Sequence, residues 1–125
     1  MTDVTDRAYD TDLLDALSKR VMVGDGAMGT QLQAADLTLD DFNNLEGCNE
    51  ILNDTRPDVI ETIHRNYFEA GADAVETNTF GCNLVNLDDC DIADKLRELS
   101  LKGTAIAKRV GVDRGDELGV QTSNG

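Results

Sequence analysis

Two segments of this 125-residue chain finish in polar side chains that could hold a small ligand. The first is Asp25-Gly26-Ala27-Met28-Gly29-Thr30, which follows an apolar run at residues 21–23. The second is Glu76-Thr77-Asn78-Thr79, which closes the run that starts at residue 73. Carboxylates, hydroxyls and amides bind ligands through hydrogen bonds, and a carboxylate in such a place is a suitable partner for an ammonium group.

Neither segment identifies a ligand by its spacing. The glycines of residues 25–30 match neither the G-x-G-x-x-G fingerprint nor a Walker loop, although they let the backbone approach a ligand closely. Asp25 could equally cap a following helix, and Glu76 could pair with a surface lysine. The alternation of side chains along a strand decides which of residues 76–79 point inward, and the sequence leaves that phase open.

The elements that would position these segments alternate between strands and helices. We expect short buried strands at residues 21–24 and 73–79 and the start of a third strand at 118–121, since each run is short and rich in strand-forming residues. Helices between them are long enough for parallel crossovers. The fold class predicted is therefore α/β with parallel strands, in which ligands bind at the carboxyl ends of the strands.

Helices are predicted from apolar spacing and from capping residues. The clearest begins near Pro57, where Thr55 and Asp58 form an [ST]-x-x-[DE] start, and ends at Gly71. His64 lies on its apolar stripe, so we interpret it as a packing histidine rather than a catalytic one. Other helices are expected at residues 12–20, 30–35 and 92–110, and loops at 36–49 and 83–91. The first of these loops is interpreted either as a lid or as a surface insertion.

Composition narrows the class of protein. A formal net charge of −14 disfavours nucleic acid and anionic membranes as partners. No apolar run approaches the roughly 20 residues of a membrane helix, and the polar residues 1–10 read as a leader without a secretory signal. Three cysteines without tight pairing suggest reduced thiols and a cytoplasmic location.

Four motifs occur in order along the chain. They are Asp25-Gly26-Ala27-Met28-Gly29-Thr30, Gly47-Cys48-Asn49-Glu50-Ile51-Leu52, Tyr67-Phe68-Glu69-Ala70-Gly71-Ala72-Asp73 and Glu76-Thr77-Asn78-Thr79-Phe80-Gly81. Together they resemble the N-terminal homocysteine-binding module of cobalamin-dependent methionine synthases, within the homocysteine S-methyltransferase family. The resemblance extends from about residue 12 to residue 110, and the Gly-Cys-Asn-Glu segment favours the cobalamin-dependent branch over the betaine-dependent one.

The resemblance implies a (β/α)8 TIM barrel of about 250 residues, of which this chain would hold the first two and a half βα units. Residues 1–20 would be a leader and short helix, and residues 21–125 the partial barrel. Residues 113–125 depart from the family pattern, so we expect a truncated or fragmentary product.

The resemblance also implies where zinc would bind. The family's zinc-binding cysteines belong to later strands, which we expect to lie beyond Gly125. Cys48, Cys82 and Cys90 do not match them, so we expect no metal site on this chain.

By the same resemblance, the intact enzyme transfers a methyl group from methylcobalamin, recharged by 5-methyltetrahydrofolate, to homocysteine. Asp25 would receive the ammonium group of homocysteine, and Gly26, Ala27 and Met28 would offer backbone groups nearby. The pocket would also be lined by Glu76, Thr77, Asn78 and Thr79. No catalytic residue, zinc or cobalamin is expected on these residues alone, and the partners implied are homocysteine and the folate and cobalamin modules.

Two alternatives remain open. A related homocysteine methyltransferase could use betaine or S-methylmethionine as methyl donor, or a thiol or selenol acceptor of another kind. A non-catalytic fragment could instead associate with a partner, because a piece of parallel sheet leaves open edges.

Overall fold

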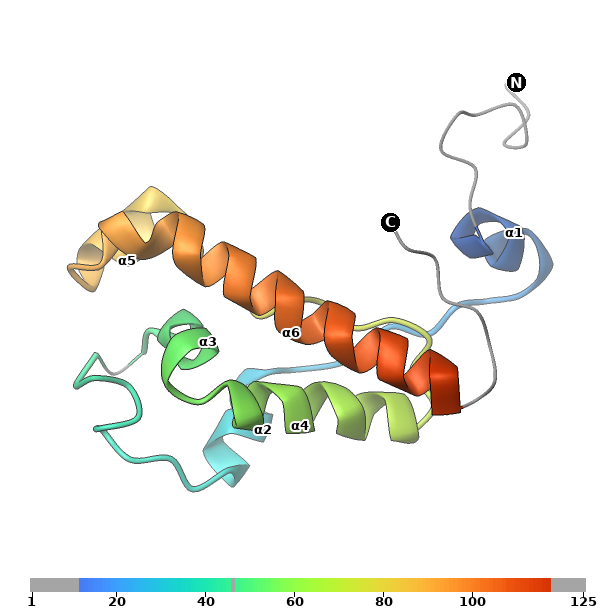
Figure 1. Cartoon of the computed structure of the whole chain (residues 1–125), viewed down its shortest axis with the longest axis horizontal. Coiled ribbons are helices and arrows are strands. Elements are labelled where there is room, and N and C mark those ends of the chain that lie inside the picture. Colours follow the sequence, from blue (N-terminus) through green and yellow to red (C-terminus); the bar gives the residue numbers. More distant parts are fainter. Residues whose placement is uncertain (1–11, 46, 118–125) are drawn as a thin grey trace.

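A computed structural model describes residues 12–45 and 47–117 of the chain (Figure 1). The predicted leader at residues 1–10 and the predicted third strand at 118–121 lie outside the described residues. Gly125, beyond which the family's zinc-binding cysteines are expected, also lies outside the described residues. Helices account for most of the assigned structure. In chain order they are α1 (Asp12–Lys19), α2 (Gly29–Ala34), η2 (Asn49–Ile51), α3 (Leu52–Thr55), α4 (Pro57–Glu69), α5 (Leu84–Asp89), η3 (Ala93–Lys95) and α6 (Leu96–Glu117).

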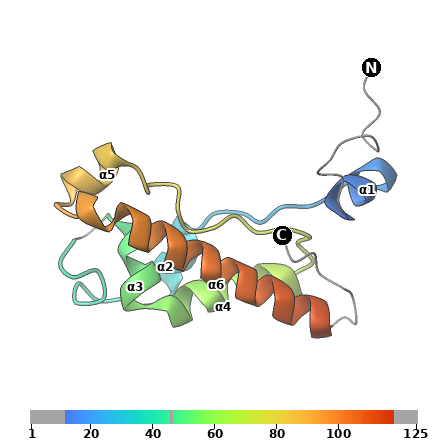
Figure 2. The same cartoon turned by 45° about the horizontal axis from the view of Figure 1, so that its top comes forward.

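Helices α4 and α6 lie side by side and form the main layer (Figures 1 and 2). Pro57 begins α4, where its missing N–H costs nothing, and Gly71 follows its end with a φ of +114°. The apolar side of α4 packs with α2, α3 and α6 into one core cluster. Its buried members are Leu32, Leu52, Val59, Ile60, Ile63 and Ile106.

A second buried cluster joins η2, α5 and the start of α6 through Ile51, Leu87, Ile92 and Leu99. Burial of each such side chain contributes about 1.5–3 kcal/mol. Phe42 packs against both clusters, so the segment before η2 is held to the core rather than projecting from it. That segment turns through positive φ angles at Asp36, Asn43 and Asn44, residue types that tolerate this conformation.

The two predicted strands at residues 21–24 and 73–79 run parallel, as expected, but form a single isolated bridge, between Gly24 and Ala74. No strand is assigned among the described residues, so the α/β prediction is met only in part. The contact is reinforced by the Asp73 N–H, which donates to the Val23 carbonyl at 2.7 Å, and by the Val23 N–H, which donates to the Asp73 carboxylate at 2.9 Å.

Burial of the first strand was also predicted, and this prediction is wrong for the described part of the chain. Val21 is 84% exposed and Val23 is 55% exposed. The physical reason is that no other described element packs over these two side chains closely enough to bury them. A pair of strands without such a partner is only marginally stable as a sheet. Figure 2 shows the two segments as extended traces running beside the helical layer.

The helices differ from the predictions in several places. Thr55 ends α3 instead of capping α4, because its hydroxyl donates to the Asp41 carbonyl and Arg56 occupies the capping position. The predicted loop at residues 83–91 contains α5, whose first turn is capped by Asn83 accepting the Asn86 N–H at 2.9 Å. The predicted helix at residues 92–110 begins as η3 and continues as α6 to Glu117.

Helix α1 matches the prediction for residues 12–20 and stands away from the other helices in both views (Figures 1 and 2). Its apolar residues Leu13 and Leu17 are each 52% exposed. Within the described residues, no helix combines the length and the apolar character required to cross a bilayer.

Candidate functional site

The two polar tips of the chain meet around one hollow of about 310 Å³. Seven of the eight predicted ligand-binding residues line it, and Thr79 does not. Three further residues line it that the sequence did not assign to a site. The complete lining is Asp25, Gly26, Ala27, Met28, Asn49, Glu50, Glu76, Thr77, Asn78 and Phe80.

Asp25 connects the two tips directly. Its Oδ1 accepts the backbone N–H of Glu76 at 3.2 Å. The alternative role as a helix cap is not found, because Met28 occupies the position before α2 and no side chain caps that helix. Glu76 forms no ion pair with any described residue, so the alternative pairing with a surface lysine is not found either.

Tyr67 holds the first tip against α4. Its hydroxyl donates to the Ala27 carbonyl at 2.7 Å. A Cβ at Gly26 would lie 3.2 Å from the Tyr67 hydroxyl oxygen, closer than nearly all real contacts of that kind. Glycine at position 26 therefore permits the close approach of the tyrosine that fixes this turn.

The second tip divides its side chains between the interior and the hollow. Asn78 is 6% exposed, and its amide donates to the Asn49 carbonyl and to Asn53 Oδ1, both at 3.0 Å. The hydroxyls of Thr77 and Thr79 lie 2.6 Å apart and share a hydrogen bond. Glu76 is exposed at the edge of the hollow. Asn78 is thus the most deeply buried side chain of this tip.

Glu50 and Asn49 reach the hollow from η2, and Phe80 reaches it from the end of the second tip. Glu50 Oε1 accepts the Gly81 N–H at 2.8 Å, which ties η2 to the second tip. The Gly-Cys-Asn-Glu and Thr-Phe-Gly motifs that carried the family resemblance contain all three residues. These two motifs alone could therefore have assigned Asn49, Glu50 and Phe80 to the site.

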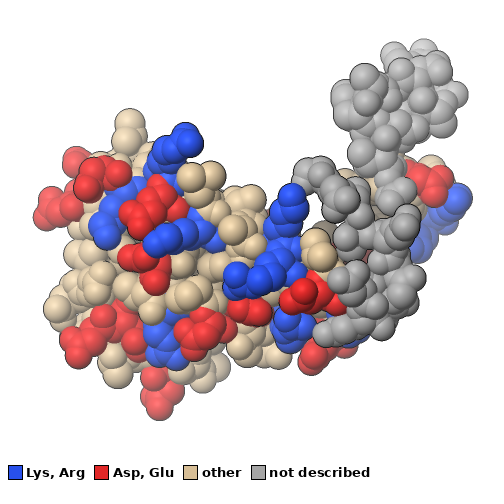
Figure 3. Space-filling view, viewed as in Figure 1, with Lys and Arg blue, Asp and Glu red and all other residues tan. Residues whose placement is uncertain are grey.

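The charge of the hollow is negative. Asp25, Glu50 and Glu76 contribute three carboxylates, and none of the residues that line it is lysine or arginine. Such a site favours a cationic group such as an ammonium and disfavours an anion that has only side chains to bind it. On the face shown in Figure 3, the Lys and Arg side chains lie next to Asp and Glu side chains.

His64 is fully buried in α4, as a packing histidine should be. Neither ring nitrogen has a hydrogen-bond partner among the described residues. Burial lowers the pKa of His64, while the negative charge of Asp25 acts in the opposite direction. The imidazole is therefore neutral at pH 7 and has no proton-transfer partner that would make it a general base.

The cysteines are not three separate thiols, as the sequence had suggested. Cys48 and Cys90 form a disulfide with their Cα atoms 6.7 Å apart. Cys82 is free, and burial raises the pKa of its thiol, which keeps it protonated at neutral pH. Spacing alone could not show this pairing, because 42 residues separate the two cysteines.

The described residues offer no donor set for a metal ion. No group of three or more His, Cys, Asp or Glu side chains gathers in a suitable arrangement among them. The zinc that the family resemblance implies therefore does not fit this part of the chain. The location of the family's zinc-binding cysteines beyond Gly125 stays a prediction, since Gly125 itself is outside the described residues.

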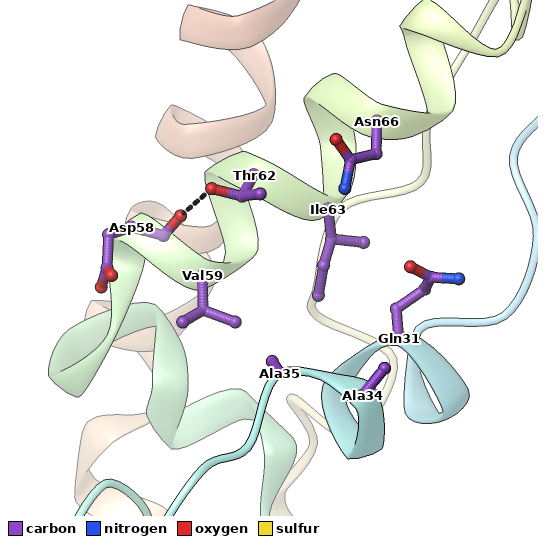
Figure 4. Close-up of a pocket in the computed structure, with 8 residues that line it drawn as sticks. All are labelled: Gln31, Ala34, Ala35, Asp58, Val59, Thr62, Ile63 and Asn66. Atoms are coloured by element: carbon purple, nitrogen blue, oxygen red, sulfur yellow. Dashed lines mark hydrogen bonds between the residues drawn. The ribbon is translucent and has the colours of Figure 1, made fainter.

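A second hollow of about 280 Å³ lies between α2 and α4 (Figure 4). Its floor is apolar, with Ala35, Val59 and Ile63. The Thr62 hydroxyl at its edge already donates to the Asp58 carbonyl at 2.9 Å. This hollow lacks the converging carboxylates of the first, so the first is the better candidate for binding chemistry.

Comparison with known proteins agrees with the motifs. A family model described as homocysteine S-methyltransferase matches residues 22–125. A protein named methionine synthase from Mycobacterium tuberculosis (strain ATCC 25618 / H37Rv) is 79% identical over 119 residues, which are 95% of this chain and 10% of that protein. Another of that name from Mycobacterium leprae (strain TN) is 74% identical over 110 residues, 88% of this chain and 9% of that protein. The chain spans about a tenth of the length of these relatives.

Proposed function

Because this chain belongs to the homocysteine S-methyltransferase family, we propose that its two polar tips bind the amino-acid end of homocysteine. The observation that carries the proposal is the hollow in which Asp25 bonds to the backbone of Glu76 and three carboxylates face a common space. Asp25 would accept the ammonium group, since it is the carboxylate fixed in place by both tips. Gly26, Ala27 and Met28 would offer backbone N–H groups to the substrate carboxylate.

The second tip would complete the wall of the pocket. Glu76 would add negative charge at the rim, and Thr77 would contact the ligand beside it. Asn78 and Thr79 would act from behind, because Asn78 is bonded inward and Thr79 lies outside the lining. We assign to these residues a binding and orienting role, with no catalytic residue.

The reaction we propose for the intact protein is methyl transfer to homocysteine to give methionine, as the name of its relatives suggests. Methylcobalamin and 5-methyltetrahydrofolate would be its methyl sources, held by modules outside these residues. By the family resemblance, the donors for zinc would come from later strands of the barrel. A cytoplasmic location fits this metabolism.

We also propose that residues 21–125 are the first part of a TIM barrel, with residues 1–20 as a leader and short helix. The parallel contact between Gly24 and Ala74 supports this arrangement, because neighbouring strands in such a barrel are parallel. Val21, Val23 and Phe80 are largely exposed. Their exposure also favours the second candidate, in which the chain associates with another polypeptide that covers these side chains.

A chimera tests the proposed function. The segment of the M. tuberculosis methionine synthase that matches this chain would be replaced by residues of this chain, which differ at about a fifth of the positions. We expect methionine formation with a KM for homocysteine within about threefold of the parent enzyme. A chimera that folds, binds its methyl donor and yet fails to bind homocysteine would contradict the proposal.

A further inference from the structure

A buried amide, Asn53, connects three parts of the chain that are distant in sequence. It lies in α3 and is 2% exposed. Its Nδ2 donates to the carbonyl of Asn78 at 2.8 Å and to the carbonyl of Leu99 at 3.1 Å. Its Oδ1 accepts from the Asn78 amide at 3.0 Å. Both hydrogens of the amide nitrogen are thus used, and the oxygen has a partner.

The main partner of Asn53 is the most deeply buried residue of the second tip. Asn78 accepts from Asn53 through its backbone carbonyl, and its side-chain amide donates to Asn53 Oδ1 and to the Asn49 carbonyl. Two residues before Asn78 is Glu76, whose N–H is bound to Asp25. Two of the three bonds of Asn53 therefore hold Asn78, which belongs to the wall of the hollow, although Asn53 itself does not line that hollow.

Space around this amide is closed by Gly103 of α6. A Cβ at position 103 would lie 2.7 Å from Asn53 Nδ2 and 2.8 Å from Thr79 Cγ2. The absence of a side chain lets α6 approach both α3 and the second tip. An apolar side chain in place of Asn53 would leave the Asn78 carbonyl and one hydrogen of the Asn78 amide without buried partners, which is costly.

We propose that Asn53 is a positioning residue, which sets the location of Glu76 and Thr77 for substrate through its paired bonds with Asn78. This inference rests on the proposed function, because it supposes that homocysteine is the molecule that meets this wall. Loss of an amide with only a structural role would lower the stability of the whole fold. Loss of a positioning amide would instead loosen one segment, residues 76–81, and lower the affinity for one substrate.

The test uses Asn53→Ala in the chimera described above, with Ile63→Ala as the matched control. Ile63 is 4% exposed and packs on the side of α4 that faces α2, so its loss destabilises the fold without touching the amide pair. KM for homocysteine, KM for the methyl donor and kcat would be measured for each. Hydrogen–deuterium exchange of the peptide that covers residues 76–81 would be followed in the same proteins.

We expect Asn53→Ala to raise the KM for homocysteine about tenfold, with kcat and the other KM within about twofold, and to accelerate exchange at residues 76–81. Asn53→Ser retains one hydrogen-bond donor, so its KM for homocysteine and its exchange rate at residues 76–81 should lie between those of the parent and of Asn53→Ala. If the alanine variant does not fold, the serine variant alone tests the positioning role. Ile63→Ala should lower Tm comparably and leave the homocysteine KM unchanged. Equal changes in KM for the Asn53 and Ile63 variants would overturn the proposal.

The two proposals fail in different ways. If the unsubstituted chimera does not bind homocysteine, the proposed function is wrong, and exchange then decides whether Asn53 positions the tip. Faster exchange confined to residues 76–81 in Asn53→Ala upholds the positioning role. Unchanged or uniformly faster exchange refutes it.

Discussion

The Asp25 carboxylate accepts the backbone N–H of Glu76 at 3.2 Å, which joins two tips that are 51 residues apart in sequence. Only Oδ1 is used in this bond, and Oδ2 has no hydrogen-bond partner in the described part of the chain. A carboxylate that is oriented by the backbone and still has an unused oxygen is well arranged to accept a hydrogen bond from a cationic ligand.

Replacement of this carboxylate should weaken substrate binding. We expect Asp25→Asn in the chimera to raise the KM for homocysteine about 30-fold or more, since losing one partner of a charged hydrogen bond costs about 2 kcal/mol or more. The asparagine keeps an oxygen for the Glu76 N–H, so the fold should be preserved. Steady-state kinetics measure the effect, and Asp15→Asn in the exposed part of α1 is the control. An unchanged KM would remove Asp25 from the site.

Two glycines of α6 should respond in opposite directions to alanine. Gly111 has open space around it, so Gly111→Ala should stabilise the helix by about 1 kcal/mol. Gly103 faces Asn53 and Thr79, and Gly103→Ala should destabilise the chain by about 1–3 kcal/mol despite the same gain in helix propensity. Urea unfolding of the two variants and the parent measures both changes. Similar stabilisation by both would show that α6 does not approach α3 as closely as described.

The single histidine of the chain should make stability depend on pH. Burial lowers the pKa of His64, so below its ordinary pKa of about 6.5 the unfolded chain binds a proton that the folded chain does not. Stability is therefore complete above about pH 6.5 and decreases as the pH falls toward the lowered folded value. Urea unfolding between pH 7.5 and pH 5 would measure this slope.

The variant His64→Leu provides the comparison for that slope, because leucine does not titrate. We expect it to lose less stability than the parent between pH 6.5 and pH 5. The pKa values of Asp41, Asp54 and Asp73 are lowered by their hydrogen-bond partners, so those carboxylates titrate below this window. Identical slopes for parent and variant would mean that His64 reaches solvent.

The Cys48–Cys90 disulfide should stabilise the oxidised chain. Its ends are 42 residues apart, and the chain-entropy relation gives about 4 kcal/mol for a loop of that length. Dithiothreitol should therefore lower the free energy of unfolding of the parent. Cys90→Ser should abolish this response, and Cys82→Ser should retain it because Cys82 is outside the pair. A parent that is indifferent to dithiothreitol would show that its cysteines remain thiols.

Local signals predicted the helices whose boundaries are set by special residues. Pro57 and Gly71 enclose α4, and Leu13, Leu14 and Leu17 marked α1. Where a distant contact decides the boundary, the sequence was insufficient. The Thr55 hydroxyl does not cap α4, because it donates to the carbonyl of Asp41, 14 residues earlier in the chain. Helix α5 has only six residues, too few to show a periodic pattern, and its cap at Asn83 was the one available signal.

The lining of the hollow could be predicted from the sequence at the two tips but not between them. Chain order placed residues 25–28 and 76–78 at the ends of predicted parallel strands, and the structure brings them to one hollow. Asn49 and Glu50 join them because η2 packs behind the second tip, which depends on the burial of Ile51 and Leu52. No apolar periodicity or capping residue in the sequence predicts that packing. The inward phase of Asn78 likewise follows from its partner Asn53, 25 residues away.

The bridge between Gly24 and Ala74 has a consequence for the rate at which the chain folds. Closing a loop of this length costs entropy before any bond repays it, and the cost grows with the logarithm of loop length. The pairing of α3 with α4 is far more local. We therefore expect α3 and α4 to pair first and the bridge to form late, so that closure of this long loop, more than the propensity of the helices, limits how fast the hollow is assembled.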